Sequence, residues 1–307
     1  MKTVSIIIPA YNEEGNIRIM VETIATLLSS LPYQYELIFV NDGSTDHTLE
    51  VITTLAKENS NIFYIELSRN FGHQSALKAG MDYAHGDCLI TLDCDMQHPP
   101  QLIAEMLSKW EEGYDVVYTR RAEDKKLPLF KRITSRTFYA LCNKLSDIEL
   151  EAGTADFRLL SRNIAHVFCS LTESDLFIRG MIKWLGFKQY AIDYEPGERF
   201  SGSTKYNLRQ MFSLALKGIT SFSVSPLYIA MYVGFFMSLL SFLYLPYVLY
   251  SYFTGHFMSG WSSMILTIVF FGGMQMMMIG ILGTYLGKIF LQSKGRPSYV
   301  VRTTNIQ

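Results

Sequence analysis

The 307-residue chain is predicted to be an α/β protein, with a mainly parallel sheet and flanking helices, followed by a two-helix hairpin that crosses a membrane. Three observations predict this architecture. Short β-branched runs alternate with stretches of helical length over the first 120 residues. Polar clusters follow four of those runs. Residues 218–287, 70 in succession, include no Asp, Glu, Lys or Arg.

The first 120 residues provide the elements of the sheet. Runs of four to eight apolar or β-branched residues favour strands, and strands that alternate with helices form βαβ units with parallel strands. The predicted strands are Val4–Ile8, Glu36–Val40, Ile62–Leu67, Cys88–Leu92 and Val116–Thr119. The predicted helices between them are Glu14–Leu28, Thr45–Glu58, Gln74–Tyr83 and Gln101–Glu112.

Polar clusters come directly after four of the predicted strands, at residues 9–13, 41–44, 68–70 and 93–95. In open α/β sheets, ligands bind beyond the carboxyl ends of the strands. The convergence of these clusters therefore predicts a single nucleotide-type site. No GxGxxG follows a strand and no GxxxxGK[ST] occurs, which disfavours a dinucleotide oxidoreductase and a P-loop NTPase.

Charge and cysteine usage exclude other classes. Residues 1–217 carry 23 basic and 28 acidic side chains, a net charge of −5, whereas a nucleic-acid-binding domain more often has a broad basic surface. We therefore expect no nucleic-acid partner. The cysteines have neither paired spacing nor a CxxC, so a reduced compartment is expected and a zinc site is not: Cys88, Cys94, Cys142 and Cys169.

The uncharged block resolves into two apolar runs, Val224–Phe253 and Ser263–Phe290, joined by the short segment Thr254–Ser262. About 20 apolar residues suffice to cross about 30 Å of hydrocarbon as a helix. The alternative is a buried core hairpin of a soluble protein, but adjacent uncharged runs of this length are rare in soluble folds. The sequence therefore favours two membrane-spanning helices.

Basic residues set the expected orientation of this hairpin. They precede the first run and follow the second, and the connecting segment has none, so the positive-inside rule places both chain ends in the cytoplasm. The apolar stretch Val4–Ile8 is too short for a signal peptide. Apolar residues at helical spacing between 206 and 222 predict an amphipathic helix on the membrane surface.

The motif Asp93-Cys94-Asp95 is the strongest chemical signal. Two carboxylates at a strand end repel each other, and a divalent cation removes that repulsion; Mg²⁺ and Mn²⁺ bind carboxylate oxygens together with substrate phosphates. A solvated acidic turn is the alternative. Asp42 has two open interpretations, turn or cap chemistry and acceptance of a hydrogen bond from a nucleotide base. Three histidines are interpreted as surface or turn residues: His73, His85 and His98.

Two basic segments suit an anionic acceptor. Arg199, Ser203 and Lys205 lie in a stretch that combines fixed cations with small residues, which suits phosphate binding. Arg120 and Lys131 belong to a second cluster that could reach a lipid phosphate. For both segments, attraction to anionic lipid at the membrane surface is the alternative.

Taken together and in order, the motifs resemble the inverting family 2 glycosyltransferases with a GT-A fold, which is Rossmann-like. The resemblance covers nearly the whole chain. It is strongest to bacterial polyprenyl-phosphate (bactoprenol) glucosyltransferases and extends to dolichol-phosphate mannose synthase relatives. The motifs that carry it are Ile8–Glu14, Val40–Asp46, Ser68–Gly72, Asp93–Pro99, Gly153–Leu159 and Arg199–Tyr206.

The resemblance implies roles for individual residues. It assigns the nucleoside to Pro9, Tyr11, Glu13 and Asp42, the metal and diphosphate to Asp93, Asp95 and Gln97, and the acceptor segment to Asp156 and Arg158. Cys94 departs from the small apolar residue that the family usually has between the two carboxylates. Asp156 stands where the family places a proposed base, and together with Asp93 and Asp95 it is expected to be a catalytic residue. A phosphate monoester is already largely dianionic at pH 7, so we expect Asp156 to orient groups rather than to remove a proton.

The resemblance also implies the reaction. It implies that a single hexose is transferred, with inversion of configuration, from a nucleotide-diphosphate sugar to polyprenyl (undecaprenyl) phosphate for cell-envelope glycosylation. Glucose is the first choice of sugar, and UDP is favoured over GDP as the nucleotide. The cofactor is Mg²⁺ or Mn²⁺, and a homo-oligomer, dimer or tetramer, is expected. N-acetylglucosamine, galactose and mannose remain alternatives. A processive polysaccharide synthase is disfavoured because QxxRW is missing, and a non-catalytic membrane partner is the remaining rival.

The expected organisation has four parts. These are a cytoplasmic catalytic domain at 1–204, an amphipathic juxtamembrane helix at 205–223, two transmembrane helices with a short external loop at 224–290, and a cytoplasmic basic tail at 291–307.

Overall fold

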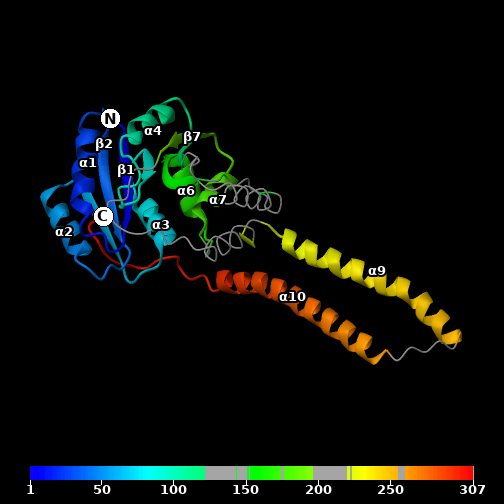
Figure 1. Ribbon diagram of the computed structural model, residues 1–307. Helices are drawn as coiled ribbons and strands as arrows, with labels where there is room; N and C mark the ends of the chain where they lie inside the picture. Colours follow the sequence, from blue (N-terminus) through cyan, green and yellow to red (C-terminus); the bar gives the residue numbers. More distant parts are fainter. Residues whose placement is uncertain are drawn as a thin grey trace.

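The computed structural model describes residues 1–121, 143, 151, 153–173, 176–195, 220–221, 223–254 and 260–306. These residues form a globular domain built on a mixed sheet, from which two long helices project as an arm (Figure 1). The strands are β1 (Thr3–Ala10), β2 (Gln34–Asn41), β3 (Ile62–Leu67), β4 (Cys88–Thr91), β5 (Val116–Arg121), β6 (Thr154–Ser161), β7 (Gln189–Tyr194) and β8 (Val301–Thr304). The helices are α1 (Ile17–Ser29), α2 (Thr48–Glu58), α3 (His73–Tyr83), α4 (Leu102–Glu111), α6 (Arg162–Ser170), α7 (Ile178–Trp184), α9 (Ser225–Phe253) and α10 (Trp261–Ser293).

The described strands are ordered β7-β5-β6-β4-β1-β2-β3-β8. The central pairs β4–β1, β1–β2 and β2–β3 are parallel, and β5 is parallel to β7. Strand β6 enters antiparallel between β4 and β5, and β8 pairs antiparallel with the outer side of β3. The carboxyl ends of β1, β2, β3 and β4 therefore lie at one edge of the sheet, where the sequence places its polar clusters.

The strands are apolar along both faces because helices cover both faces. Ile6 and Ile8 point to the side covered by α1, α2 and α4, whereas Ile7 points to the side covered by α3, α6 and α7. All three isoleucines are fully buried. Each face thus has its own hydrophobic core, and the functional loops emerge from a rigid centre.

The predicted α/β class, the mainly parallel sheet and its flanking helices are confirmed. Each of the five predicted strands and four predicted helices is present, with ends that differ by at most three residues from those expected, and Ile62–Leu67 coincides with β3. Strands β6, β7 and β8 and helices α6 and α7 were not predicted. Strand β8 lies in the segment that was interpreted as a basic tail, and it completes the edge of the sheet instead.

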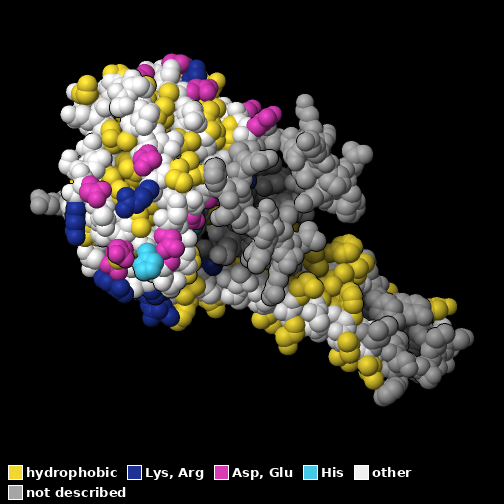
Figure 2. Space-filling view, turned by 60° about the vertical axis from the view of Figure 1, so that its left-hand side comes forward, with side chains coloured by type: hydrophobic (Ala, Val, Ile, Leu, Met, Phe, Trp, Pro, Cys, Tyr) yellow, Lys and Arg dark blue, Asp and Glu magenta, His cyan; other side chains and the backbone are white. Residues whose placement is uncertain are grey.

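The arm consists of α9 and α10, which run in opposite directions and contact each other (Figure 1). Hydrophobic side chains cover the visible described part of this arm, whereas charged side chains gather on the globular domain (Figure 2). Within the described residues, Thr267–Ser293 is long and apolar enough to cross a membrane, and none of it is buried in the protein. The apolar stretch described in α9, Ser225–Leu240, is shorter.

One helix of crossing length is therefore found in the described part, and the predicted two-helix crossing is not confirmed. The first predicted run is nonetheless helical from Ser225 to Phe253, with Pro246 inside it. The predicted amphipathic helix lies outside the described residues, apart from 220, 221 and 223.

Hydrogen bonds join the two sides of the arm at its base and attach α10 to the globular domain. The hydroxyl of Tyr285, on α10, donates to the carbonyl oxygen of Ser223 at 2.8 Å, close to the start of α9. Near the end of α10, the amide of Gln292 donates to the carbonyl oxygen of Thr172 at 2.7 Å. The last turns of α10 thus lie against the domain rather than away from it.

Candidate active site

Four loops meet at the carboxyl edge of the sheet: the β1–α1 loop (residues 11–16), the β2–α2 loop (42–47), the β3–α3 loop (68–72) and the β4–α4 loop (92–101). The first two are cross-linked by Asn12, whose side-chain oxygen accepts from the amide of Thr45 at 2.9 Å and whose own amide donates to the hydroxyl of Ser44 at 3.1 Å. Asn12 adopts φ 58°, in the left-handed region that asparagine tolerates. This edge is therefore built as one connected unit.

Asp42 joins the β2–α2 loop to the β3–α3 loop. Its two carboxylate oxygens accept hydrogen bonds from the amides of Phe71 and Gly72 at 2.7 and 2.9 Å. The side chain is buried, and burial raises the pKa of Asp42 although these amides act in the opposite direction. Each oxygen has a second lone pair, so the predicted contact with a nucleotide base stays a prediction beside this structural role.

Gly43 permits the close approach of these two loops. It has φ +68°, and a Cβ at this position would lie 2.6 Å from the backbone of Arg69 and Asn70. A side chain would be strained in this conformation and would also collide with main-chain atoms. The turn chemistry proposed for this motif is therefore present, and it fixes the distance between the loops.

Asp93 is held by two histidines. The Nε2 of His98 lies 3.2 Å from one carboxylate oxygen, and the Nε2 of His73 lies 3.4 Å from the other. The hydroxyl of Tyr194, on β7, is 2.7 Å from Nδ1 of His98. Because an ionised carboxylate only accepts, the hydrogen bond to Asp93 places a proton on Nε2 of His98, and the tyrosine hydroxyl pairs with the second ring nitrogen. Burial alone would raise the pKa of Asp93, but His98 and the charge of His73 hold it below its ordinary value.

The predictions for the three histidines have different outcomes. His98 is only 2% exposed, so it is not a surface residue, although it does lie at a bend in the β4–α4 loop. His73 begins α3 and, although 42% exposed, lies between Asp93 and Asp156, which it approaches to 3.6 Å. His85 is exposed as expected.

Asp156 is a buried carboxylate surrounded by cations. Arg179 binds it with two hydrogen bonds of 2.8 Å, and Arg158 adds a contact of 3.4 Å. Gln74 donates to it at 3.4 Å and accepts from the amide of Ile178 at 3.0 Å, which ties the starts of α3 and α7 together. Burial raises the pKa of Asp156, but the guanidinium groups outweigh it and hold the pKa well below its usual range.

A carboxylate held in this way is a poor proton acceptor at neutral pH, because an efficient general base has a pKa near the working pH. The geometry instead suits a carboxylate that positions Arg179 and His73 beside Asp93. This agrees with the orienting role expected for Asp156.

The predicted acceptor-binding arginines already have protein partners. Arg158 is 2% exposed, burial lowers its pKa to about 10, and its Nε has no hydrogen-bond partner within the described part of the chain. Arg120 forms a two-point pair with Asp193 at 2.7 and 3.0 Å and contacts Glu151 at 3.4 Å. The other predicted acceptor residues, Lys131, Arg199, Ser203 and Lys205, lie outside the described residues.

The residues of the β4–α4 loop fit a divalent cation in part. Asp95 accepts from the amide of Gln97 at 3.1 Å, which closes a tight turn around Met96, at φ 58°. The side-chain oxygen of Gln97 accepts from Arg121 at 3.2 Å, so its predicted ligand atom already has a donor. No cluster of three or more His, Cys, Asp or Glu suited to a metal occurs among the described residues.

Two carboxylates are nevertheless the usual protein contribution to a Mg²⁺ site that substrate phosphates complete. Asp93 and Asp95 can make that contribution. Burial raises the pKa of Glu13, and the charges of Asp95, Asp46 and Asp93 raise it further. A negative field is therefore present at this edge, and a bound cation would relieve it.

The remaining predicted nucleoside residues lie on β1 and the loop that follows. Pro9 is buried within β1 opposite Val40. Tyr11 is 46% exposed, with its ring at the surface of the site edge. The carboxylate of Glu13 accepts from the side chain of Asn16 at 2.6 Å. Glu13 is thus close enough to the β4–α4 loop to interact with the charges of Asp95 and Asp93.

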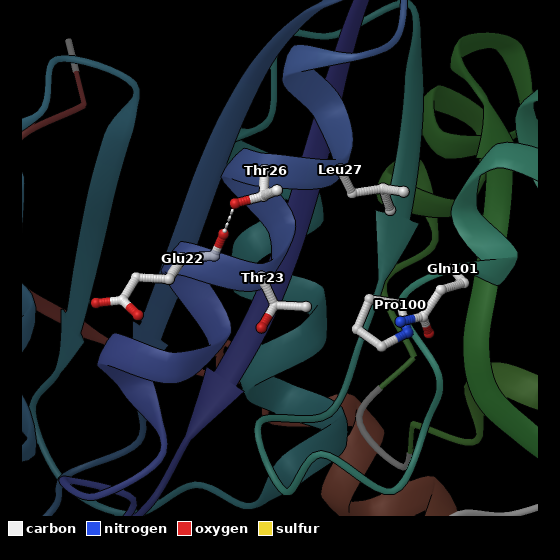
Figure 3. A pocket seen from close by; sticks show the side chains of 6 residues that line it. All are labelled: Glu22, Thr23, Thr26, Leu27, Pro100 and Gln101. Carbon is white, nitrogen blue, oxygen red and sulfur yellow. Dashed lines mark hydrogen bonds between the residues drawn. The ribbon is translucent and has the colours of Figure 1, made fainter.

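A hollow of about 380 Å³ lies on the outer side of α1, beside the start of α4 (Figure 3). Its walls contain none of the predicted site residues, and Thr26 there donates to the carbonyl oxygen of Glu22 at 2.7 Å within α1 itself. The hollow therefore touches only the last two residues of the β4–α4 loop and not the predicted site residues. It is lined by Glu22, Thr23, Thr26, Leu27, Pro100 and Gln101.

Sequence reasoning missed five residues of this constellation: His73, Gln74, Arg179, Tyr194 and, as a buried partner of Asp93, His98. His73 and Gln74 come directly after the motif Ser68–Gly72 and could have been included with it. Arg179 and Tyr194 lie on α7 and β7, which were not predicted, so their positions relative to the site could not be inferred from the sequence.

The amino-acid sequence was compared with protein-family models and with known proteins, and both comparisons find glycosyltransferases. The family model described as "Glycosyl transferase family 2" matches residues 5–168. The chain is 42% identical to the uncharacterized glycosyltransferase YkcC of Bacillus subtilis (strain 168), over 97% of this chain and 93% of that protein. It is 37% identical to the bactoprenol glucosyl transferase of Shigella phage SfV and to the prophage bactoprenol glucosyl transferase homolog of Escherichia coli (strain K12), in each case over 97% of this chain and 98% of the relative.

Proposed function

Because the chain belongs to glycosyl transferase family 2, we propose that it transfers a single hexose from a nucleotide-diphosphate sugar to a polyprenyl phosphate. Glucose is the first choice of sugar, since relatives that match 98% of their own length are named as a bactoprenol glucosyl transferase and a homolog of one. UDP is the first choice of nucleotide on the family resemblance of the motifs. The observation that carries the proposal is the pairing, at one sheet edge, of Asp93 and Asp95 with the cation-rich surroundings of Asp156. Asp93 and Asp95 suit a metal-bound diphosphate, and the cations around Asp156 suit a phosphate nucleophile.

For the donor, we propose that Asp42, Tyr11 and Glu13 contact the nucleoside, supported by Pro9 in β1. Asp93 and Asp95, with Gln97 nearby, hold the divalent cation and the diphosphate. When bound, Mg²⁺ or Mn²⁺ would neutralise the leaving diphosphate. The side-chain oxygen of Gln97 accepts one hydrogen bond from Arg121 and keeps a second lone pair that could face the cation.

For the acceptor, the lipid phosphate approaches the anomeric carbon from the side opposite the leaving group, so that configuration inverts in one step. Asp156 holds Arg179 and, through His73, a positive charge beside Asp93. These cations lower the repulsion between the incoming phosphate and the carboxylates. Arg120, Arg158, Lys131, Arg199, Ser203 and Lys205 are the further acceptor residues that we propose.

The apolar arm supports a lipid acceptor. Exposed aromatic and aliphatic side chains along α9 and α10 have no protein surface over them within the described part of the chain. We propose that both helices cross the membrane, with the catalytic domain (1–204) and both chain ends in the cytoplasm, and that 205–223 lies at the bilayer surface. A dimer or tetramer remains a prediction.

The proposal is tested by incubating the purified full-length chain with undecaprenyl phosphate and radiolabelled UDP-glucose, UDP-N-acetylglucosamine, UDP-galactose or GDP-mannose, with and without Mg²⁺ or Mn²⁺. Label in the lipid extract that requires the cation is the expected result. Asp95→Ala should abolish it, whereas Glu58→Ala, which removes an exposed carboxylate at the end of α2, should not. A fully active Asp95→Ala variant would refute the metal assignment.

A further inference from the structure

The last strand of the chain contains an irregularity next to the site. Strand β8 pairs with β3 through Ile65 and Thr304, then Glu66 and Thr303, and then Leu67 and Val301. The step from Thr303 to Val301 leaves Arg302 without an opposite residue on β3, which is a β-bulge. Bulges of this kind redirect a side chain and are frequent beside functional sites.

The redirected side chain of Arg302 reaches the end of β3 and the start of the loop that follows. Its Nη1 donates to the carboxylate of Glu66 at 2.9 Å, and its Nη2 donates to the carbonyl oxygen of Ser68 at 2.9 Å. The amide of Ser68 donates in turn to the carbonyl oxygen of Val300 at 2.8 Å. The first residue of the β3–α3 loop is thus held at both its backbone groups by the C-terminal strand.

The other end of the same loop holds the donor side of the site. The amides of Phe71 and Gly72 fix the carboxylate of Asp42, and Gly43 touches the loop backbone. Helix α3 then begins at His73, which contacts Asp93. Five residues of backbone therefore connect Arg302 to two groups that the site uses.

We propose that Arg302 is a positioning residue for the donor nucleotide: by holding Glu66 and Ser68 it fixes the β3–α3 loop and, through that loop, the carboxylate of Asp42. The inference rests on the proposed function, in which Asp42 contacts the nucleoside. It gives the C-terminal segment, which the sequence presents only as basic residues near a membrane, a part in substrate binding. Nothing in this role requires contact between Arg302 and the substrate.

Loss of this ion pair should cost the fold some stability. The side chain of Arg302 is 61% exposed, but Glu66 is only 10% exposed, and its buried carboxylate would lose this partner. The effect on the site should appear as a loss of preorganisation, which weakens binding without changing the chemical step. Donor binding and the turnover number should therefore respond differently.

The test compares Arg302→Ala with Arg296→Ala in the full-length chain. Arg296 is exposed, lies six residues earlier in the same segment, and has no hydrogen bond or ion pair with the described residues. For Arg302→Ala we expect the KM for the nucleotide sugar and the Kd for UDP to rise about fivefold. The kcat should stay within about twofold, and the KM for undecaprenyl phosphate should not change. Arg296→Ala should match the unmodified chain in every value.

A second variant keeps the test decisive if Arg302→Ala does not fold. Arg302→Lys retains the charge beside Glu66, but one ammonium cannot reproduce both contacts of the planar guanidinium. A smaller increase in donor KM, about twofold to threefold, is expected. A donor KM equal to that of the unmodified chain would overturn the proposal.

Failure of this inference is distinguishable from failure of the proposed function. An unmodified chain that transfers sugar and binds UDP, while Arg302→Ala matches it in donor KM and Kd, overturns the positioning role alone. An unmodified chain that neither transfers sugar nor binds UDP or GDP overturns both. A parallel fall in kcat with no change in UDP affinity also overturns the positioning role, because it indicates a general structural defect.

Discussion

Replacement of Asp156 by asparagine tests the central electrostatic arrangement of the site. The variant keeps the shape of the side chain but leaves Arg158, which is 2% exposed, without its counter-charge. Removal of one partner from a buried ion pair destabilises a protein by about 3–5 kcal/mol. Arg179 is 38% exposed and remains partly solvated, and asparagine retains one acceptor oxygen. We therefore expect a loss of about 2–3 kcal/mol, or a fall in Tm of about 4–12 °C for a domain of this size.

The measurement is thermal unfolding of the purified chain in detergent. Asp193→Asn is the matched control, because it removes an exposed carboxylate from another arginine and should lower stability by less than about 1 kcal/mol. A double-mutant cycle with Arg158→Met isolates the pair: loss of the buried cation should offset part of the damage, with a coupling energy of about 1–3 kcal/mol.

The pH dependence provides a second readout. The folded-state pKa of Asp156 lies well below that of the unfolded chain, near 3.9, so its contribution to stability is present above that value and disappears as the pH falls below it. The difference in stability between the unmodified chain and Asp156→Asn should therefore not shrink between pH 8 and pH 5. It should grow over this range, because burial lowers the pKa of His73 but Asp156 and Asp93 raise it above its ordinary value, and a protonated His73 is stabilised more by the carboxylate than by asparagine. A difference that already shrinks between pH 7 and pH 5 would show that the carboxylate is not held as described.

Two outcomes would refute the reasoning about Asp156. One is an Asp156→Asn variant that melts within about 1 °C of the unmodified chain, with no coupling to Arg158. The other is a variant that folds normally and binds UDP but has lost all transfer, which would favour the role of general base. Retention of substantial transfer at a temperature well below the Tm is the expected result.

Three further predictions concern neighbouring positions. Gly43→Ala would place a methyl group 2.6 Å from the backbone of the β3–α3 loop, so Tm should fall by several degrees and UDP affinity by about tenfold; Gly15→Ala, whose Cβ meets nothing within 4 Å, is the control. Tyr194→Phe leaves a ring nitrogen of the buried His98 unpaired; stability should fall by about 1–3 kcal/mol and the Mn²⁺ concentration for half-maximal activity should rise about tenfold in a metal titration. Arg120→Ala should change stability by less than about 1 kcal/mol but raise the KM for undecaprenyl phosphate severalfold, and an unchanged KM would exclude Arg120 from the acceptor site.

The parallel core was predictable because its signals are local. Runs such as Ile62–Leu67 combine β-branched residues over the length of a strand, and the helices between them have clear periodicity. The same alternation fixes which loops share an edge, so the neighbourhood of Asp42, Asp93 and Asp95 followed from topology alone.

The missed elements depend on long-range pairing. Strand β6 contains Asp156 and Arg158, and these two charged residues interrupt its apolar pattern. Both are nevertheless buried in the fold, where Arg158 and Arg179 pair with Asp156. Strand β8 has four residues, and Arg302 at its bulge is polar, so nothing local distinguishes it from a tail. The burial of His98 was not predictable, because its partner Tyr194 lies 96 positions away in the sequence.

The place of β8 in the sheet also has a consequence for biosynthesis. Both long helices of the arm precede β8 in the chain, so a ribosome translates them before the residues that close the outer edge of β3. Until then, the backbone groups of β3 on that side remain unpaired and accessible to other chains. The order of translation therefore delays completion of the domain until the segments that we expect to enter the bilayer have been made.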